Sequence, residues 1–184
     1  NEIDAHCRSL GVYFERKDNP SISEKKIDAV KNWERLRKGY TVYSEQAVSA
    51  VSYIKGSKKK ILEDIEPYEK LTLAEVVEKS CIGEPVVWHE MFDAITPAER
   101  SYMLSMLRRG EKITKSPRIK LSTIHSAKGG EADNVMLLTD IPHRTWKEYE
   151  KRPDDDTRVF YVGLTRAKEN LHIIQPMTNK YFPV

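Results

Sequence analysis

Several residues that could bind a phosphate lie in the segment "LSTIHSAKGGEADNVMLLTD", residues 121–140. The middle of this segment is a run of small residues that would let the backbone approach a ligand closely and offer N–H groups to an anion: Ser126, Ala127, Gly129 and Gly130. Lys128 adds a cation, and Glu131 adds a hydrogen-bond acceptor. An ordinary turn with surface charges would contain the same residue types, so both interpretations stay open on this pattern alone.

A second segment, "DDDTRVFYVGLTRAKENLHII", contains arginines at a regular spacing. Arg158, Val162 and Arg166 recur every four residues, which predicts both arginines on one side of a helix, about 12 Å apart along its axis. Arginine is suited to clamping phosphate oxygens and to stabilising charge in phosphoryl transfer. The alternative is that Arg166 and Lys168 are solvated charges at a helix C-terminus, where cations are favoured.

The elements that would position these residues are short runs rich in Val, Ile and Leu. Four runs are predicted to be strands: "VYFER", "RIKLSTI", "NVMLLTD" and "LHIIQP". A helix is predicted between the last two, in "DDTRVFYVGLTRAKEN", where Gly163 would allow close helix packing. Strands that alternate with a helix favour a parallel sheet covered on both faces. Ligands bind such sheets beyond the C-terminal ends of the strands, and "IKLSTI" would deliver residues 125–131 to that edge.

Residues 21–110 are predicted to be mostly helical. Capping-box patterns start at Ser21 with Glu24 and at Thr72 with Glu75, and Thr96 is followed by Pro97 and Glu99. Gly39 and Gly110 stand where helices should end. Trp33 lies on an apolar helical stripe and is expected in the core rather than stacked on a base. The helical region thus resembles an insertion between two parts of one α/β domain.

The beginning of the chain, "NEIDAHCRSLG", reads as a helix already under way that Gly11 stops, which suggests a domain whose start was cut off. The 184 residues contain 39% hydrophobic and 32% charged residues with a net charge of +3, which is typical of a globular protein and not of a disordered one. Cys7 and Cys81 have no paired spacing for a disulfide or a zinc site. We therefore expect a cytoplasmic protein without a metal site of its own and without a membrane span.

Taken together, "TIHSAKGGEADNVMLL" and "RVFYVGLTRAKENLHII" resemble the last two conserved motifs of superfamily 1 DNA helicases of the UvrD/Rep type. The first motif is matched by Thr123, His125, Ala127, Lys128, Gly129, Glu131 and Val135. The second is matched by Asp155, Asp156, Arg158, Tyr161, Val162, Gly163, Leu164, Thr165, Arg166 and Ala167. This chain departs from the family pattern at Gly130, Ala132 and Thr157. The first two departures are expected to loosen the packing behind the loop.

The resemblance implies an ATP-driven motor of two RecA-like lobes with ATP in the cleft between them. The chain has no G-x-x-x-x-G-K-[ST] segment, so it is similar to the second lobe only. The P-loop and the Mg²⁺ ligands are expected on the N-terminal lobe. The implied fold is a RecA-like parallel sheet flanked by helices, with residues 1–20 and 114–184 forming the lobe. Residues 21–113 would be a reduced version of the family's accessory subdomain.

The resemblance also implies roles for individual residues. Arg166 would reach the γ-phosphate across the cleft, and Glu131 would hydrogen-bond the nucleotide ribose. Single-stranded DNA would meet Thr123, His125, Ser126 and Lys128. Lys128 and Gly129 would link the nucleotide and DNA sites, and Arg158 would support the arginine-bearing helix on the nucleotide side.

The resulting hypothesis is the C-terminal motor domain of an ATP-dependent DNA helicase, bacterial or phage-encoded, that translocates 3′ to 5′ in repair or replication. Its partners would be single-stranded DNA or DNA junctions and the N-terminal lobe of the same protein. The isolated chain is expected not to hydrolyse ATP. The alternative is a non-catalytic nucleic-acid-binding or partner-docking module derived from the helicase fold, although such a module needs neither Arg166 nor Glu131.

Overall fold

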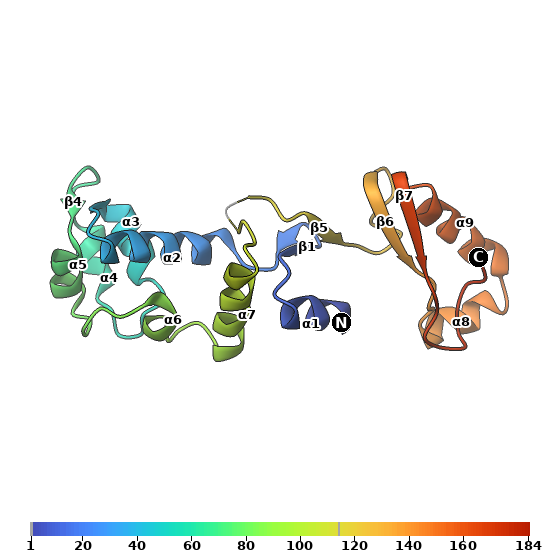
Figure 1. Ribbon diagram of the computed structural model, residues 1–184, viewed down its shortest axis with the longest axis horizontal. Coiled ribbons are helices and arrows are strands. Elements are labelled where there is room, and N and C mark those ends of the chain that lie inside the picture. The colour runs from blue at the N-terminus through green and yellow to red at the C-terminus, as the bar shows by residue number, and fades with distance from the viewer. Residues whose placement is uncertain (1, 114) are drawn as a thin grey trace. The chain divides into compact units, whose positions relative to one another are not determined.

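The computed structural model describes residues 2–113 and 115–184, and the chain forms two compact units (Figure 1). The first unit comprises residues 1–121 and the second residues 122–184. Each unit has a hydrophobic core of its own. The predicted boundary at residue 114 lies outside the described residues, and the division into a lobe and an insertion stays a prediction.

A small sheet in the first unit joins residues from both ends of that unit. Helix α1 (Glu2–Ser9) leads into β1 (Phe14–Arg16), which pairs in parallel with β5 (Ile119–Leu121) and antiparallel with β2 (Asn19–Pro20). Gly11, at φ +66°, follows α1, and a Cβ there would lie 2.7 Å from the Cβ of Ser105. Both the left-handed backbone and the close approach therefore require glycine. The predicted helix and its stop at Gly11 are confirmed.

The rest of the first unit is mainly helical, as predicted. Its elements in chain order are α2 (Glu24–Arg37), β3 (Val42–Tyr43), α3 (Ser44–Val51), α4 (Lys59–Glu63), β4 (Lys70–Leu71), α5 (Leu73–Ser80), α6 (Trp88–Met91) and α7 (Pro97–Arg108). The two short strands β3 and β4 pair antiparallel. Trp33 is completely buried and its Nε1 donates to the carbonyl of Val86 at 2.9 Å. The expectation that Trp33 is a core residue is confirmed.

Two of the three predicted helix caps are confirmed. The amide of Glu75 bonds the Oγ1 of Thr72, whose own amide donates to the Glu75 carboxylate at 2.7 Å, and the amide of Glu99 donates to the Oγ1 of Thr96. The capping box at Ser21 is wrong, because α2 begins at Glu24 after Ser23. The Ser21 hydroxyl instead contacts the hydroxyl of Tyr102, 2.6 Å away, and accepts from the amide of Phe14.

The second unit pairs β6 (Ala132–Leu138) in parallel with β7 (Ala167–Ile174), and the chain between them forms α8 (His143–Tyr149) and α9 (Pro153–Leu164) (Figure 1). Helix α8 was not predicted from the sequence. The core of this unit consists of Leu137, Ile141, Phe160 and Phe182. The rings of Phe160 and Phe182 stack with their centroids 4.1 Å apart. A Cβ at Gly163 would lie 3.1 Å from a methyl group of Leu137, which confirms close packing of α9 on β6.

The parallel pairings are confirmed, whereas the prediction that these strands belong to one RecA-like sheet stays a prediction. Among the described residues β1 and β5 belong to one sheet and β6 and β7 to another. Apolar runs identify strands but do not specify which strand pairs with which, because pairing depends on contacts between distant residues. The molecule is therefore a mixed α/β protein with small sheets.

Helix α9 is also shorter than predicted. It ends at Leu164, and β7 starts at Ala167 rather than near Leu171. The Thr165 hydroxyl donates back to the carbonyls of Tyr161 and Val162 at 3.1 Å, and the carbonyl of Arg166 accepts from the amide of Ala132 at 3.0 Å. Pairing with β6 therefore replaces the helical hydrogen bonds that this segment would otherwise form.

Candidate functional site

The loop that precedes β6 contains one helical turn that starts at Thr123. The amide of Thr123 donates to the Oγ of Ser126, and the amide of Ser126 donates to the Oγ1 of Thr123, each at 3.2 Å. The amide of Ala127 then bonds the carbonyl of Thr123 at 3.0 Å. This reciprocal pairing follows the logic of a capping box. Both residues are exposed, but their hydroxyls already bond one another at 2.7 Å.

The turn ends at the two glycines. Gly129 has φ +84°, and the amide of Gly130 bonds the carbonyl of Ala127 at 3.0 Å. A Cβ at position 129 would meet no described atom within 4 Å, so the backbone angle rather than crowding favours glycine there. Both glycines are exposed, and a ligand can approach their backbone closely.

Arg166 lies against this glycine turn. Its Nη1 donates to the carbonyl of Gly130 at 3.3 Å, its Nε to the carbonyl of Val162 at 2.9 Å and its Nη2 to the Oγ1 of Thr165 at 2.9 Å. All three acceptors are neutral, and the guanidinium forms no ion pair with any carboxylate of the described chain. The bonds fix the direction of the side chain and leave its positive charge uncompensated.

The position of Arg166 differs from the helical prediction. It follows the end of α9, so Arg158 and Arg166 do not share a helix. Arg158 lies on α9, is exposed, and has no hydrogen bond or ion pair with a described residue. A supporting role for Arg158 stays a prediction.

Glu131 is exposed beside the same turn and has one ionic partner. Its carboxylate lies 3.7 Å from the Nζ of Lys168, and the two side chains are 57% and 54% exposed. Lys168 was not among the predicted site residues. Its spacing from Arg166 could have identified it, because residues two apart lie on the same face of a strand.

His125 and Lys128 are exposed on the helical turn. The electrostatic influence of His125 extends to Asp156 in the first turn of α9. Burial raises the pKa of the Asp156 carboxyl, Asp155 and Glu148 raise it further, and the positive charge of His125 lowers it. An acidic group of α9 therefore lies near enough to His125 for their charges to interact.

The geometry gathers the loop and the arginine at one edge of the second sheet. Ala132 pairs with Ala167, so the loop before β6 and Arg166 before β7 both lie at the N-terminal ends of these strands. The loop was expected beyond the C-terminal end of a strand, and this holds for β5, which the loop follows in the chain. Arg166, Gly130 and Glu131 are brought together at this edge.

No metal-binding cluster of three or more His, Cys, Asp or Glu side chains occurs within residues 2–113 and 115–184. Within the same residues no helix is long and apolar enough to cross a membrane.

The edge of the second sheet at Arg166 offers a guanidinium, an ammonium, a carboxylate and exposed glycine backbone to a ligand. These groups suit a ligand that carries both an anionic group and hydroxyl groups.

Comparison with known proteins adds independent findings. Residues 24–177 match the family model of the UvrD-like helicase C-terminal domain. Over 103 residues the chain is 28% identical to the ATP-dependent DNA helicase Rep of Escherichia coli (strain K12), a match that covers 54% of this chain and 14% of that protein. Over 70 residues it is 34% identical to a probable DNA helicase II homolog of Rickettsia conorii (strain Malish 7), covering 35% of this chain and 11% of the relative.

The matched segments therefore span only a small part of these curated relatives. No solved structure matches the chain significantly.

Proposed function

The chain belongs to the family of UvrD-like helicase C-terminal domains, and we propose that it is the C-terminal motor domain of an ATP-dependent DNA helicase. In this role it supplies an arginine finger to ATP and part of the grip on single-stranded DNA. The relatives named as ATP-dependent DNA helicases support the proposal. The observation that carries it is the contact between the Arg166 guanidinium and the carbonyl of Gly130.

Arg166 is the proposed catalytic residue. Its guanidinium is held by three neutral oxygens, so its direction is defined while its charge stays available. An arginine in this state can stabilise the negative charge that develops on a γ-phosphate, provided that another lobe brings the phosphate to it. A structural arginine would more commonly be neutralised by a carboxylate.

The residues beside Arg166 fit a nucleotide. Glu131 would accept a hydrogen bond from the ribose, and Gly129 and Lys128 would contact the phosphates, with Arg158 on the same side. The open space around Gly129 is compatible with a ligand that lies against the backbone. Bound ATP with Mg²⁺ supplies the phosphoryl group that is transferred to water, and the ligands of the metal would come from the N-terminal lobe.

The other side of the same loop is the proposed DNA grip. His125 and Lys128 are exposed and can contact DNA phosphates. The hydroxyls of Thr123 and Ser126 bond each other and stabilise the turn, and these two residues would contact DNA at the beginning of the turn. The bond from Arg166 to Gly130 links the finger to this turn. A displacement of the arginine on nucleotide closure would therefore pull on the loop that holds DNA, and we propose that this contact couples the two sites.

The domain organisation follows from the same proposal. Residues 1–20 and 114–184 would form the RecA-like lobe, and the helical residues 21–113 a reduced accessory subdomain. Translocation would run 3′ to 5′. Its biological setting would be DNA repair or replication in a bacterium or phage.

The proposal is tested by ATP hydrolysis of the whole gene product with and without single-stranded DNA. Arg166→Ala should lower the DNA-stimulated rate by about a thousandfold, in line with the contribution of arginine fingers, while nucleotide binding changes little. Arg144→Ala is the matched control, because Arg144 is 93% exposed on α8 of the same unit. Equal rates for Arg166→Ala and the wild type would remove the finger and favour the non-catalytic binding module.

A further inference from the structure

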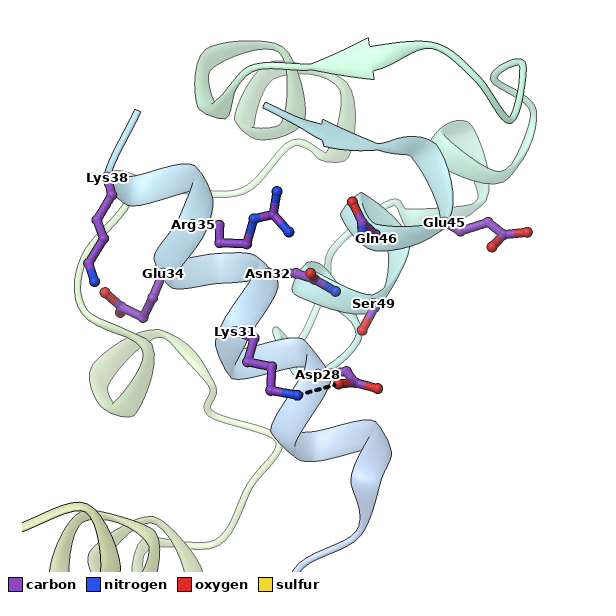
Figure 2. A pocket seen from close by; sticks show the side chains of 9 residues that line it. All are labelled: Asp28, Lys31, Asn32, Glu34, Arg35, Lys38, Glu45, Gln46 and Ser49. Carbon is purple, nitrogen blue, oxygen red and sulfur yellow. Dashed lines mark hydrogen bonds and ion pairs between the residues drawn. The ribbon is translucent and has the colours of Figure 1, made fainter. Parts of the chain in front are cut away.

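A polar cleft of about 650 Å³ lies between α2 and α3 in the first unit (Figure 2). Helix α2 contributes Asn32 and Arg35 to it, and α3 contributes Gln46 and Ser49. Each pair is three residues apart, so both members project from one side of their helix. None of these residues belongs to the site at Arg166.

Asn32 is the most unusual residue in this cleft. It is only 9% exposed, yet its side-chain amide forms no hydrogen bond with the described part of the chain. Figure 2 shows the amide on the side of α2 that faces α3, close to Gln46 and Ser49. No side-chain nitrogen or oxygen of the described residues is both fully buried and without a partner, so the Asn32 amide opens onto the cleft, where water or a ligand can bond it. The cleft is the place where Asn32 can find that partner.

The other groups around Asn32 are mainly donors. The carbonyl of the Gln46 side chain accepts from the amide of Tyr43 at 3.1 Å, which leaves its NH₂ group to donate. The Ser49 hydroxyl and the Arg35 guanidinium bond no side chain or backbone group of the described residues. Arg35 points across the cleft toward Gln46 (Figure 2). The cleft therefore offers amide, hydroxyl and guanidinium donors from two helices.

The carboxylates near the cleft are already engaged or point elsewhere. Asp28 pairs with Lys31 at 3.2 Å, and Glu34 pairs with Arg37 at 2.9 Å. Glu45 points away from Asn32 (Figure 2). Arg35, Lys38 and Glu45 form no ion pair with a described side chain, so the unpaired charges around the cleft are two cations and one carboxylate.

We propose that the cleft between α2 and α3 binds a phosphate group through Arg35, Asn32, Gln46 and Ser49. A tetrahedral oxyanion accepts hydrogen bonds from several directions, which matches donors that come from two facing helices. A guanidinium suits phosphate oxygens through its fork of N–H groups. The volume exceeds that of a single phosphate and falls in the range of ligand pockets, so the phosphate would be part of a larger molecule.

The test is calorimetric titration of the 184-residue chain with inorganic phosphate at low ionic strength. We expect saturable binding to the wild type and about tenfold weaker binding to Arg35→Gln, because a charged donor is lost. Arg108→Gln, an exposed arginine at the end of α7, removes the same charge outside the cleft and should bind like the wild type.

Asn32→Leu separates a binding role from a structural one. Because the amide has no protein partner, an apolar side chain of similar size should leave the melting temperature unchanged or raise it, while phosphate binding weakens. Two sources of the phosphate are then distinguished by adding short duplex DNA. Displacement of inorganic phosphate by the duplex identifies a nucleic-acid backbone, and retention identifies a small phosphate compound.

Three results would overturn the proposal. They are the absence of saturable phosphate binding, equal affinities of Arg35→Gln and Arg108→Gln, and a lower melting temperature of Asn32→Leu with unchanged phosphate affinity. The comparison of Arg35→Gln with Arg108→Gln is independent of Arg166, which lies in the other unit and is unchanged in both variants.

Discussion

Arg166 and Glu131 carry opposite charges at the glycine turn, but they do not form an ion pair with each other. Arg166 bonds only neutral oxygens, and Glu131 is balanced by Lys168 across 3.7 Å. An exposed ion pair at that distance contributes little to stability. Both groups are therefore free to change partner when a ligand arrives.

Glu131→Gln tests the nucleotide role of this carboxylate. The variant keeps the shape of the side chain but accepts a hydrogen bond less strongly, so nucleotide affinity of the whole gene product should fall roughly tenfold. Its free energy of unfolding should change by less than about 0.5 kcal/mol, because the pair with Lys168 is exposed. Fluorescent-nucleotide titration measures the affinity. Glu169→Gln, a nearby exposed glutamate, serves as the control, and an equal loss in both variants would argue against a specific role.

Asp140 links acid stability to the end of the chain. Backbone and hydroxyl hydrogen bonds from Met177 and Thr178 hold the pKa of the Asp140 carboxyl below its usual range. A lowered pKa means that the folded state favours the ionised form. Its stabilising contribution is therefore present above the unfolded-state pKa, and it is lost as the pH falls through the folded-state pKa.

We expect Asp140→Asn to lower the free energy of unfolding near neutral pH and to flatten its decline in acid. Urea unfolding between about pH 2 and pH 7 measures this dependence, around an unfolded-state pKa of about 3.9. Asp133→Asn is the control, because the Asp133 carboxylate forms no hydrogen bond with the described side chains or backbone. Parallel pH profiles for Asp140→Asn and the wild type would contradict the assignment.

At the scale of helices, the caps show which local signals predict structure. The helix starts at Thr72 and at Thr96 with Pro97 were predicted correctly, because their interactions lie within three residues along the chain. The predicted cap at Ser21 was wrong, because the Ser21 hydroxyl bonds the hydroxyl of Tyr102, which is far away in the sequence. No local pattern carries that information.

The caps also give a matched pair of variants. Thr72→Ala should lower the free energy of unfolding by about 1 kcal/mol, because it removes the acceptor for the Glu75 amide. Ser23→Ala should change it by only a few tenths of a kcal/mol, because Ser23 caps α2 without a side-chain hydrogen bond. Urea unfolding of both variants measures the difference. Equal losses would show that cap identity rather than the observed bond decides stability.

The end of α9 shows where local propensity is overridden. Arg158 and Arg166 have helical spacing, and the segment between them continues well as a helix. The backbone nevertheless leaves the helix at Thr165, because residues 167–174 pair with β6. The motif residues make Arg166 and Glu131 candidates for the site, whereas their contacts with Gly130 and Lys168 depend on strand pairing that the sequence pattern does not specify.

At the scale of the whole molecule, the strands and their parallel pairing could be predicted from the sequence. The runs at residues 14–16, 119–121 and 134–138 do form strands with parallel partners. Whether the two strand pairs belong to one sheet depends on contacts between residues that are far apart in the chain. Hydrophobic patterning is silent on that choice.

The 184-residue chain by itself is expected to bind single-stranded DNA weakly and not to hydrolyse ATP. Phosphate contacts would dominate its DNA affinity, so affinity should fall as salt rises. Lys128→Ala should reduce the slope of log affinity against log salt by roughly 0.7, the value for one lost contact to a single strand. Fluorescence anisotropy measures the slope, with the exposed Lys147→Ala on α8 as control. An unchanged slope for Lys128→Ala would remove Lys128 from the DNA grip.

The most direct measurement of the central claim compares how the whole gene product binds a ground-state and a transition-state analogue. A finger that acts on developing charge should matter for ADP with aluminium fluoride and not for a non-hydrolysable ATP analogue. We expect Arg166→Ala to weaken transition-state analogue binding by at least about a hundredfold while ground-state affinity stays within about threefold. Equal weakening of both analogues, or of neither, would contradict the account.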